Sequence, residues 1–363
     1  MKKIGAIVGA AALALALAAC GSSSTTTNSS AAKSTSASGT LTGAGSTFAA
    51  PVYMQWGSEL SGLTLNYSPV GSGAGLTALE SKTADFGASD PPLKPADVTA
   101  LSKVGTPIQI PMFFGAITIS YNLSGVASGL KLDGTTLADI FLGKITTWNN
   151  SAIAALNPGV KLPSTSITVI HRSDSSGTTD GFTTFLSAVD PTWKSQVGAG
   201  KDVQWPVGTG AKGNAGVAAA IQQSPGAVGY VEQAYALEHK FTTADVKNAA
   251  GNYVAPTLAS TTAAAVGLPV PSDLGIQVVN PPGATAYPIV SQTFVVTYKD
   301  PCKAGVPGGS ASATALVKFL DYGLGAGQSI LPQAYYAPLP PSLLSKSKAA
   351  VAGLTCNGAA ITG

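Results

Sequence analysis

From residue 40 onward, short runs of β-branched and aromatic residues alternate with helical stretches that begin at Gly, Ser or Thr. The runs predict strands at residues 63–67, 108–110, 116–121, 167–170 and 294–298. The helical stretches are residues 48–60, 76–82, 137–141, 182–189, 217–223 and 313–322. This alternation predicts an α/β architecture with buried, mostly parallel sheets. The chain has 363 residues, enough for two domains at about 150 residues each.

The N-terminal residues have the pattern of an exported protein. Lys2 and Lys3 precede an uncharged apolar run over residues 4–19, which is short for a transmembrane helix and ends in small residues, as a signal peptide does. The sequence Leu17-Ala18-Ala19-Cys20 matches the bacterial lipobox, in which the cysteine is diacylated and becomes the first mature residue. An ordinary signal peptide that contains a cysteine is the alternative. We therefore expect residues 1–19 to be a lipoprotein signal peptide and Cys20 to carry lipid.

The segment after the lipobox predicts a tether. Residues 20–40 consist almost wholly of Ser, Thr, Ala, Gly and Asn. Such a segment buries too little apolar surface to offset its ordering entropy, so we expect it to be disordered. The protein is then extracytoplasmic and anchored by lipid, on the periplasmic side of a membrane or at the cell surface.

The two remaining cysteines predict a disulfide. With Cys20 carrying lipid, Cys302 and Cys356 form an even pair in an oxidising compartment. A bond between them closes a loop of about 55 residues and is worth ~4 kcal/mol in the chain-entropy model. Two free buried thiols are the alternative.

Charge and composition exclude some classes of function. There are 20 basic and 17 acidic residues, so the net charge is only +3. This balance argues against a broad basic face for nucleic acid, because that binding needs many phosphate-neutralising charges. Two His and three Cys, widely scattered, leave little material for a zinc or iron–sulfur site. Every basic residue is Lys except Arg172, which suggests that this one Arg is present for its geometry.

Three segments place a Gly/Ser/Thr turn directly before a helix: residues 43–48, 71–75 and 172–178. The first turn of a helix exposes unpaired N–H groups, which attract anions. Gly lets the backbone approach a ligand closely, and Ser or Thr adds a hydroxyl donor. Because Ser and Thr are also the preferred N-caps, each segment alone is weak evidence for an anion site.

Two charged residues strengthen the anion hypothesis. The guanidinium of Arg172 matches two oxygens of a tetrahedral oxyanion; a structural salt bridge to Asp174 is the alternative, and both roles are compatible. Pro91 favours an extended conformation for Asp90, at the end of a short strand. A carboxylate beside an anion site makes chemical sense if the ligand carries a proton and donates it.

Taken in order, these segments resemble the substrate-binding protein of the high-affinity phosphate ABC importer, the PstS family. The matching stretches are GAGSTFAAPVY from Gly43, the turn at 71–75, ADFGASDPPL from Ala84, LADIFLGKITTWN from Leu137, HRSDSSGTT from His171 and GNAGVAAAIQQSPGAVGYVE from Gly213. They cover nearly the whole mature chain. The resemblance implies a type II periplasmic-binding-protein fold with phosphate in a cleft between two lobes. Lobe one would take residues 41–113 and 288–363, and lobe two residues 114–287, with crossings near Phe113 and Tyr287.

The resemblance also implies site residues and partners. Position by position, it assigns phosphate binding to Thr47, Phe48, Ser72, Asp90, Arg172, Ser176, Gly177 and Thr178. Asp180 and His171 depart from the family pattern, and we expect both to point away from the anion. The implied partners are inorganic phosphate, the ABC permease of a phosphate importer and a membrane reached through the lipid. We expect a monomer without cofactor, metal or nucleic acid.

The protonation of the ligand favours phosphate independently. Near neutral pH phosphate keeps at least one proton, and sulfate keeps none. Sulfate would leave Asp90 facing another acceptor in a desolvated cleft. Sites built to hydrogen-bond a ligand proton reject the proton-free analogue by ~10⁴ or more.

Three alternatives remain open from the sequence. A hydrolase using Ser176 or Ser72 as nucleophile needs a base, and only His171 lies near Ser176, without a Gly-x-Ser-x-Gly elbow. The glycine-rich residues 208–213 lack the Walker spacing of an ATPase. A binding protein for another oxyanion, such as sulfate, molybdate or a phosphonate, is the second alternative, and a lipid-anchored adhesion or signalling protein is the third.

Overall fold

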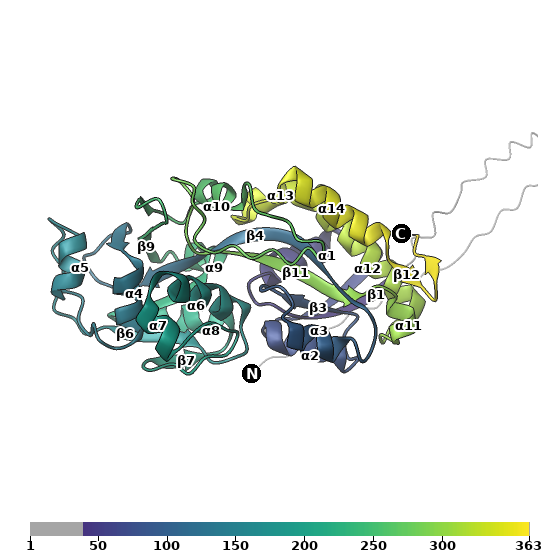
Figure 1. Ribbon diagram of the computed structural model, residues 1–363, viewed down its shortest axis with the longest axis horizontal. Helices are drawn as coiled ribbons and strands as arrows, with labels where there is room; N and C mark the ends of the chain where they lie inside the picture. Colours follow the sequence, from purple (N-terminus) through teal and green to yellow (C-terminus); the bar gives the residue numbers. More distant parts are fainter. Residues whose placement is uncertain (1–38, 363) are drawn as a thin grey trace, which may run out of the picture. The chain divides into compact units, whose positions relative to one another are not determined.

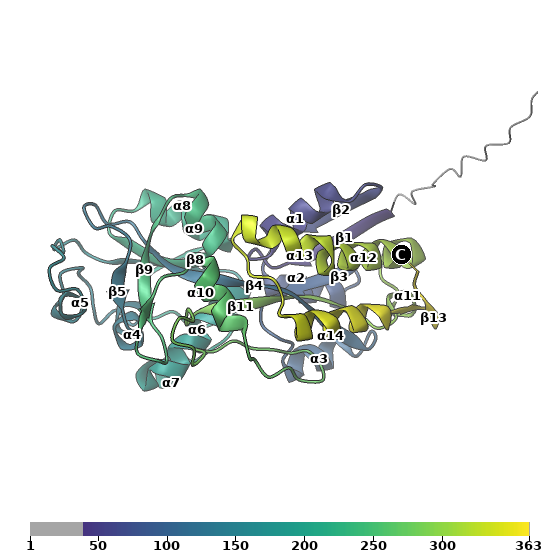
Figure 2. The same cartoon turned by 90° about the horizontal axis from the view of Figure 1, so that it is seen from above.

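The structure, a computed structural model, describes residues 39–362. The predicted signal peptide, the lipid-bearing Cys20 and the tether as far as residue 38 lie outside the described residues. A mixed sheet of 11 strands, with helices packed around it, runs through the described chain (Figures 1 and 2). Among residues 39–362, no helix combines the length and the apolar character needed to cross a membrane.

The first section of the sheet holds the N- and C-terminal parts of the chain. Its strand order is β2 (Leu63–Ser68), β1 (Gly39–Gly45), β3 (Phe86–Ser89), β11 (Val290–Tyr298) and β4 (Pro107–Tyr121). Its helices are α1 (Ala50–Glu59), α2 (Ser72–Glu80), α3 (Pro95–Leu101), α11 (Pro301–Ala304), α12 (Gly309–Leu324), α13 (Ala326–Ile330), η1 (Leu331–Ala334) and α14 (Pro341–Ala352). A short hairpin of β12 (Thr355–Cys356) and β13 (Ala359–Ala360) follows α14.

The second section holds the middle of the chain. Beyond β4 the strand order continues with β8 (Ala227–Glu232), β6 (Thr168–Arg172) and β7 (Thr209–Ala211). β9 (Thr242–Lys247) pairs with β4, β5 (Leu130–Leu132) and β10 (Tyr253–Val254). The helices are α4 (Gly134–Phe141), α5 (Ser151–Leu156), α6 (Gly177–Val189), α7 (Pro191–Gln196), α8 (Gly213–Gln223), α9 (Gln233–Glu238) and α10 (Leu258–Ala265).

Strand β4 belongs to both sections. Its residues from Pro107 to Ala116 pair with β11, and those from Ile117 onward pair with β8. The sequence predicted two separate strands here, at residues 108–110 and 116–121, and Pro111 lies between them. Proline lacks the N–H that a ladder needs, and β4 accommodates it beside a register shift in the pairing with β11, opposite Phe294. One strand of 15 residues therefore connects the two sections.

The sheet is mixed rather than mostly parallel, which corrects the prediction. β1, β2 and β3 pair in parallel, as do β6, β7 and β8. The central strand pairs are antiparallel: β11 with β3, β11 with β4, and β4 with β8. The reason is the connectivity, because β4 leaves the first section and β11 returns to it in the opposite direction.

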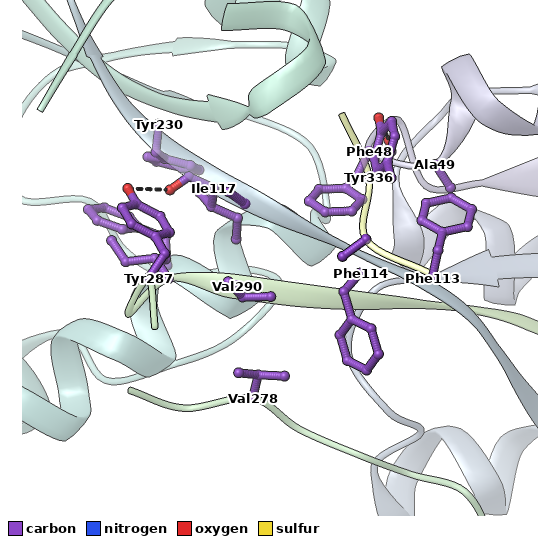
Figure 3. Packing of buried hydrophobic residues seen from close by; sticks show 14 of the residues in the cluster. Phe48, Ala49, Phe113, Phe114, Ile117, Tyr230, Val278, Tyr287, Val290 and Tyr336 are labelled. Carbon is purple, nitrogen blue, oxygen red and sulfur yellow. Dashed lines mark hydrogen bonds between the residues drawn. The ribbon is translucent and has the colours of Figure 1, made fainter. Parts of the chain in front are cut away.

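Aromatic packing holds Phe48, in the turn between β1 and α1, against this sheet. Phe48 and Tyr336 meet edge to face at 5.9 Å, and Tyr336 lies 5.0 Å from Phe113 (Figure 3). All three side chains are fully buried. The Tyr336 hydroxyl also donates to the carbonyl oxygen of Phe48 at 2.8 Å. Packing and a hydrogen bond together hold the backbone that precedes α1 in place.

The predicted disulfide is confirmed. Cys302, in α11, and Cys356, in β12, are bonded across 54 residues of chain. Asp300 strengthens the same junction, since its carboxylate accepts from the backbone N–H groups of Lys303, Asn357 and Gly358. The bond therefore fastens the C-terminal hairpin to α11, the short helix that follows β11.

Candidate anion-binding site

The three glycine-rich turns lie at the carboxyl ends of parallel strands. Residues 46–49 connect β1 to α1, Ser72 begins α2, and Asp90 directly follows β3. Ser176 is the N-cap of α6, which follows β6 in the chain. Ligands of open α/β sheets bind at this edge, so the fold brings the predicted site residues to the expected place.

Gly177 shows how closely the turns approach one another. A Cβ atom built on Gly177 would lie 2.3 Å from Asp90 Oδ2 and 2.5 Å from Ser72 Oγ. The backbone N–H of Gly73 also donates to the carbonyl oxygen of Ser175 at 3.1 Å. Residues from the two sections of the sheet are therefore in contact here, and only glycine fits at position 177.

The first turn of α6 presents backbone donors where Gly177 approaches Asp90 and Ser72. The N–H of Ser176 donates to Lys201 O at 3.0 Å, and the N–H of Thr179 donates to Ser176 Oγ at 3.1 Å. Four N–H groups at a helix start have no partner within the helix. The remaining two, on the buried Gly177 and Thr178, are available to an anion.

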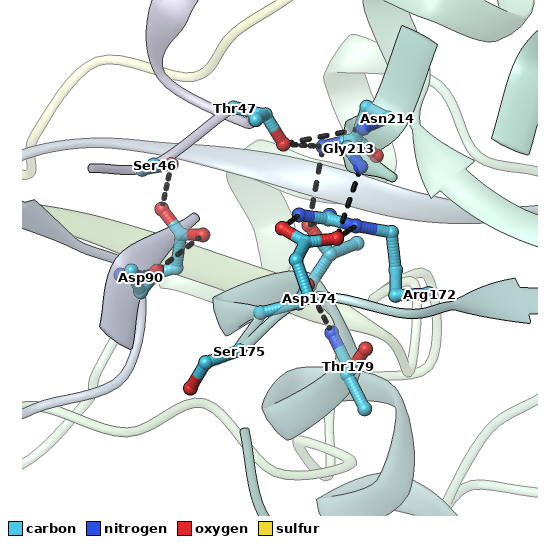
Figure 4. A network of polar contacts seen from close by, with 12 residues as sticks. Ser46, Thr47, Asp90, Arg172, Asp174, Ser175, Thr179, Gly213 and Asn214 are labelled. Atoms are coloured by element: carbon cyan, nitrogen blue, oxygen red, sulfur yellow. Dashed lines mark hydrogen bonds and ion pairs between the residues drawn. The ribbon is translucent and has the colours of Figure 1, made fainter. Parts of the chain in front are cut away.

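Arg172 is held in one orientation by three hydrogen bonds to two neighbours. Its Nε and Nη2 donate to the two carboxylate oxygens of Asp174, at 2.7 and 2.5 Å (Figure 4). Its Nη1 donates to Thr178 Oγ1 at 3.2 Å. Although burial acts to raise the pKa of Asp174, hydrogen bonds from Arg172 and Gly213 outweigh it and lower that pKa. The predicted Arg172–Asp174 salt bridge is present, and it aims the guanidinium.

Asp90 is a buried carboxylate that receives two hydroxyl groups. Ser46 Oγ donates to Oδ1 at 2.5 Å (Figure 4). Ser72 Oγ donates to Oδ2 at 3.3 Å. Gln292 fixes the backbone by donating to Asp90 O at 2.7 Å. Burial raises the pKa of Asp90 to about 6, against the lowering effect of the hydroxyl donors and of Arg172. The group is ionised above that pH and then acts only as an acceptor.

The other predicted residues take different positions. Thr47 is buried beside Asn214, and the side chain of Phe48 lies in the core, so that only the backbone of Phe48 faces the turn. His171 stacks on Trp205 with ring centroids 4.7 Å apart. Asp180 pairs with Lys94 Nζ at 2.6 Å. In residues 39–362 no three His, Cys, Asp or Glu side chains gather to hold a metal ion.

Two residues of the site were missed by the sequence analysis. Ser46, next to the assigned Thr47, bonds to Asp90 rather than facing a ligand. Asn214 bonds to Thr47 and Thr178 from the start of α8. Its position in the stretch from Gly213 was the available signal, but its partner Thr47 lies 167 residues away in the chain.

A second buried carboxyl group lies behind the site. Glu232 is fully buried; its Oε2 accepts from the N–H of Ala234 at 2.8 Å, and its Oε1 has no hydrogen-bond partner among the described residues. Burial raises the pKa of Glu232 to about 8. Burial therefore favours the protonated form of Glu232 in the folded protein.

This shift predicts a pH dependence of stability. Since the folded-state pKa of Glu232 lies above its ordinary value of 4.5, the folded state is favoured at low pH and loses that stabilisation as the pH rises through about 8. We expect the free energy of unfolding to fall between pH 5 and pH 9, and Glu232→Gln to reduce that fall. Denaturant titrations of the wild type and of Glu232→Gln at pH 5 and pH 9 measure this fall in the free energy of unfolding. An equal fall in both would mean that Glu232 is ionised in the folded state.

Sequence relatives connect this geometry to a family. A family model described as a PBP superfamily domain matches residues 30–325. Two proteins named phosphate-binding protein PstS, from Xylella fastidiosa (strain 9a5c) and Pasteurella multocida (strain Pm70), are each 40% identical to the chain, over 315 and 316 residues. The alignments cover 85% of this chain and 84% and 89% of those relatives. The chain belongs to the PstS family.

Solved structures agree with the fold of a PstS-family chain. The structure of a high affinity periplasmic phosphate-binding protein, bound with phosphate at pH 8.5, matches with a TM-score of 0.70 at 23% identity. The match covers 89% of this chain and 96% of that chain. The predicted resemblance and the two-lobed type II periplasmic-binding-protein fold are confirmed. Membership of this family also confirms that the chain is a binding protein and not an enzyme.

Proposed function

We propose that this chain captures inorganic phosphate outside the cytoplasm and delivers it to the permease of an ABC importer. The PstS relatives are named as phosphate-binding proteins, and one structural neighbour is described as a periplasmic one. The observation that carries the proposal is Asp90, a buried carboxylate that already accepts from the hydroxyl groups of Ser46 and Ser72.

The donors and the acceptor together fit a singly or doubly charged phosphate. The donors we assign to it are the N–H and hydroxyl groups of Thr47, Phe48, Ser72, Ser176, Gly177 and Thr178, with the guanidinium of Arg172. Asp90 accepts a hydrogen bond from the P–OH group that phosphate retains near neutral pH. Sulfate has no such proton, and its oxygens would face the Asp90 carboxylate without a hydrogen bond.

Calorimetric titration with phosphate, sulfate and arsenate at fixed pH and ionic strength tests this function. We expect phosphate to bind, and sulfate to bind at least ~10³-fold more weakly because its contact with Asp90 is repulsive. Equal binding of phosphate and sulfate would assign the site to another oxyanion. No heat and no competition with any of the three anions would overturn the proposal.

We propose that lobe one comprises residues 41–113 and 288–363 and lobe two residues 114–287, and that phosphate closes them about crossings near Phe113 and Tyr287. The change of partner along β4 at residue 117 supports the first of these crossings, close to Phe113. Phosphate would then replace lobe mobility with ligand contacts. Small-angle scattering with and without phosphate measures the closure, and an unchanged radius of gyration would contradict it.

Two ion pairs across the proposed cleft predict an effect on release. Asp180 is almost fully buried and pairs with Lys94, and Lys201 pairs with Asp97 at 3.0 Å. Because Lys94 is largely exposed, its pair is worth at most about 1 kcal/mol. We expect Lys94→Met to weaken phosphate binding by up to about 5-fold, chiefly through faster dissociation in stopped-flow measurements.

A matched lysine on lobe two provides the control. Lys144 pairs with Asp139 at 3.0 Å and is as exposed as Lys94, but both partners lie in the same lobe. Lys144→Met should therefore leave the dissociation rate unchanged. Equal rates for the wild type and Lys94→Met would show that the Lys94–Asp180 pair does not respond to closure.

We also propose that Cys20 is diacylated and that the protein acts as a lipid-anchored monomer. The lipobox at residues 17–20 and the Ser/Thr-rich residues 21–40 support the anchor. Cys20→Ser is expected to move the exported protein from the membrane fraction to the soluble fraction. Retention of the variant at the membrane would contradict lipid anchoring at Cys20, and light scattering of the released protein tests the monomer.

A further inference from the structure

Asn214, at the start of α8, contacts hydroxyl groups on both sides of the proposed cleft. Its side chain is fully buried. Its Nδ2 donates to Thr47 Oγ1 at 2.9 Å (Figure 4). The same nitrogen donates to Thr178 Oγ1 at 3.2 Å. An amide nitrogen carries two hydrogens, so these two contacts use both of them.

The orientation of the Asn214 amide follows from its other neighbour. The backbone N–H of Glu232 lies 3.0 Å from Oδ1 of Asn214. A backbone N–H only donates, so the atom that faces it must be the amide oxygen. The amide nitrogen is then the atom that faces the two threonines, and both threonine oxygens must accept from it.

The hydroxyl groups of Thr47 and Thr178 each accept one further hydrogen bond. Thr47 Oγ1 also accepts from the backbone N–H of Asn214, at 3.2 Å. Thr178 Oγ1 also accepts from Nη1 of Arg172, at 3.2 Å. A hydroxyl group has two acceptor positions and one proton. Donors occupy both acceptor positions of each threonine, and each proton is left to be donated elsewhere.

We propose that Asn214 is a positioning residue that commits the hydroxyl groups of Thr47 and Thr178 to donating to the bound anion. This rests on the proposed phosphate function and deepens it. Neither hydroxyl has an acceptor position left, so each donates to an anion oxygen and neither can receive the proton of phosphate. The proton of phosphate is therefore directed to Asp90, and Asn214 contributes to selectivity without touching the ligand.

A double-mutant cycle separates positioning from a general structural role. Asn214→Ala is made in the wild type and in a Thr47→Val/Thr178→Val background, and inorganic phosphate is titrated calorimetrically at pH 8. We expect Asn214→Ala to weaken phosphate binding about 10-fold in the wild type and no more than 2-fold in the background without the hydroxyl groups. The same loss in both backgrounds would overturn the proposal, because Asn214 would then act independently of the threonines.

Asn214→Asp provides a second variant that preserves shape. Aspartate still accepts from the Glu232 N–H, but it replaces the donor to the threonines with an acceptor that takes their protons. We expect phosphate affinity to fall at least 10-fold, with the melting temperature of the ligand-free protein reported beside it. An affinity within 2-fold of the wild type would overturn the proposal. Failure of the wild type itself to bind phosphate would instead refute the proposed function.

Discussion

Arg172→Lys is expected to weaken phosphate binding by about 5- to 150-fold, corresponding to ~1–3 kcal/mol. The guanidinium places three nitrogens in one plane, and two of them are fixed by Asp174 while the third reaches Thr178. Lysine keeps the charge but carries its donors on a single nitrogen. It cannot engage both oxygens of Asp174 and the anion in the same geometry.

Calorimetry on Arg172→Lys at fixed pH measures this loss, and the melting temperature of the ligand-free variant controls for folding. Asp174→Asn is the companion variant, since it keeps the size of the acid and weakens its hold on the guanidinium. We expect its loss to be smaller than that of Arg172→Lys, because the fork remains present. Near-unchanged phosphate affinity in Arg172→Lys would remove Arg172 from the proposed site.

The charge of the proposed site explains why orientation matters more than net attraction. Arg172 is neutralised by Asp174, and Asp90 adds a further negative charge above pH 6. The cleft therefore does not attract an anion by net charge. Binding must come from oriented N–H and hydroxyl donors in a desolvated space, where hydrogen bonds to charged groups are stronger than neutral ones.

The helices of the site could be predicted from the sequence, but the apolar period alone did not locate their first residues. Periodicity placed helices at 182–189 and 217–223, whereas α6 begins at Gly177 and α8 at Gly213. The first turns consist of Gly, Ser, Thr and Asn, which have modest helix propensity and no apolar period. These turns are the segments that line the proposed site, so the weakest helical signal coincides with the residues that matter most.

Contacts between distant parts of the chain set a second limit. The eight residues assigned through the resemblance occur in short local motifs, and the fold brings their segments together. By contrast, the Asn214–Thr47 and Lys94–Asp180 contacts join residues 167 and 86 positions apart. Nothing local in the sequence marks such pairs, because they depend on how the two sections of the sheet meet at β4 and β11.

Asp90→Asn is expected to lower the ratio of phosphate to sulfate affinity by at least ~10-fold, or about 1.4 kcal/mol. Asparagine occupies the same volume but carries no charge, and it can turn its NH₂ group towards an anion. Phosphate loses a charge-assisted hydrogen bond and also loses repulsion from the carboxylate, so its affinity changes modestly. Sulfate gains more, because it no longer faces an unpaired carboxylate.

The pH dependence of sulfate binding by the wild type should also follow the charge of Asp90. Because burial raises the pKa of Asp90 to about 6, acidification through that range protonates Asp90 in the ligand-free protein and turns it into a donor. Sulfate binding should then strengthen between pH 8 and pH 5 in the wild type and stay nearly constant in Asp90→Asn. Asp180→Asn is the matched control: it removes another buried carboxylate, one that pairs with Lys94, and should leave the affinity ratio unchanged. A ratio that survives intact in Asp90→Asn, at fixed pH and ionic strength, would mean that Asp90 is structural and that selectivity arises elsewhere.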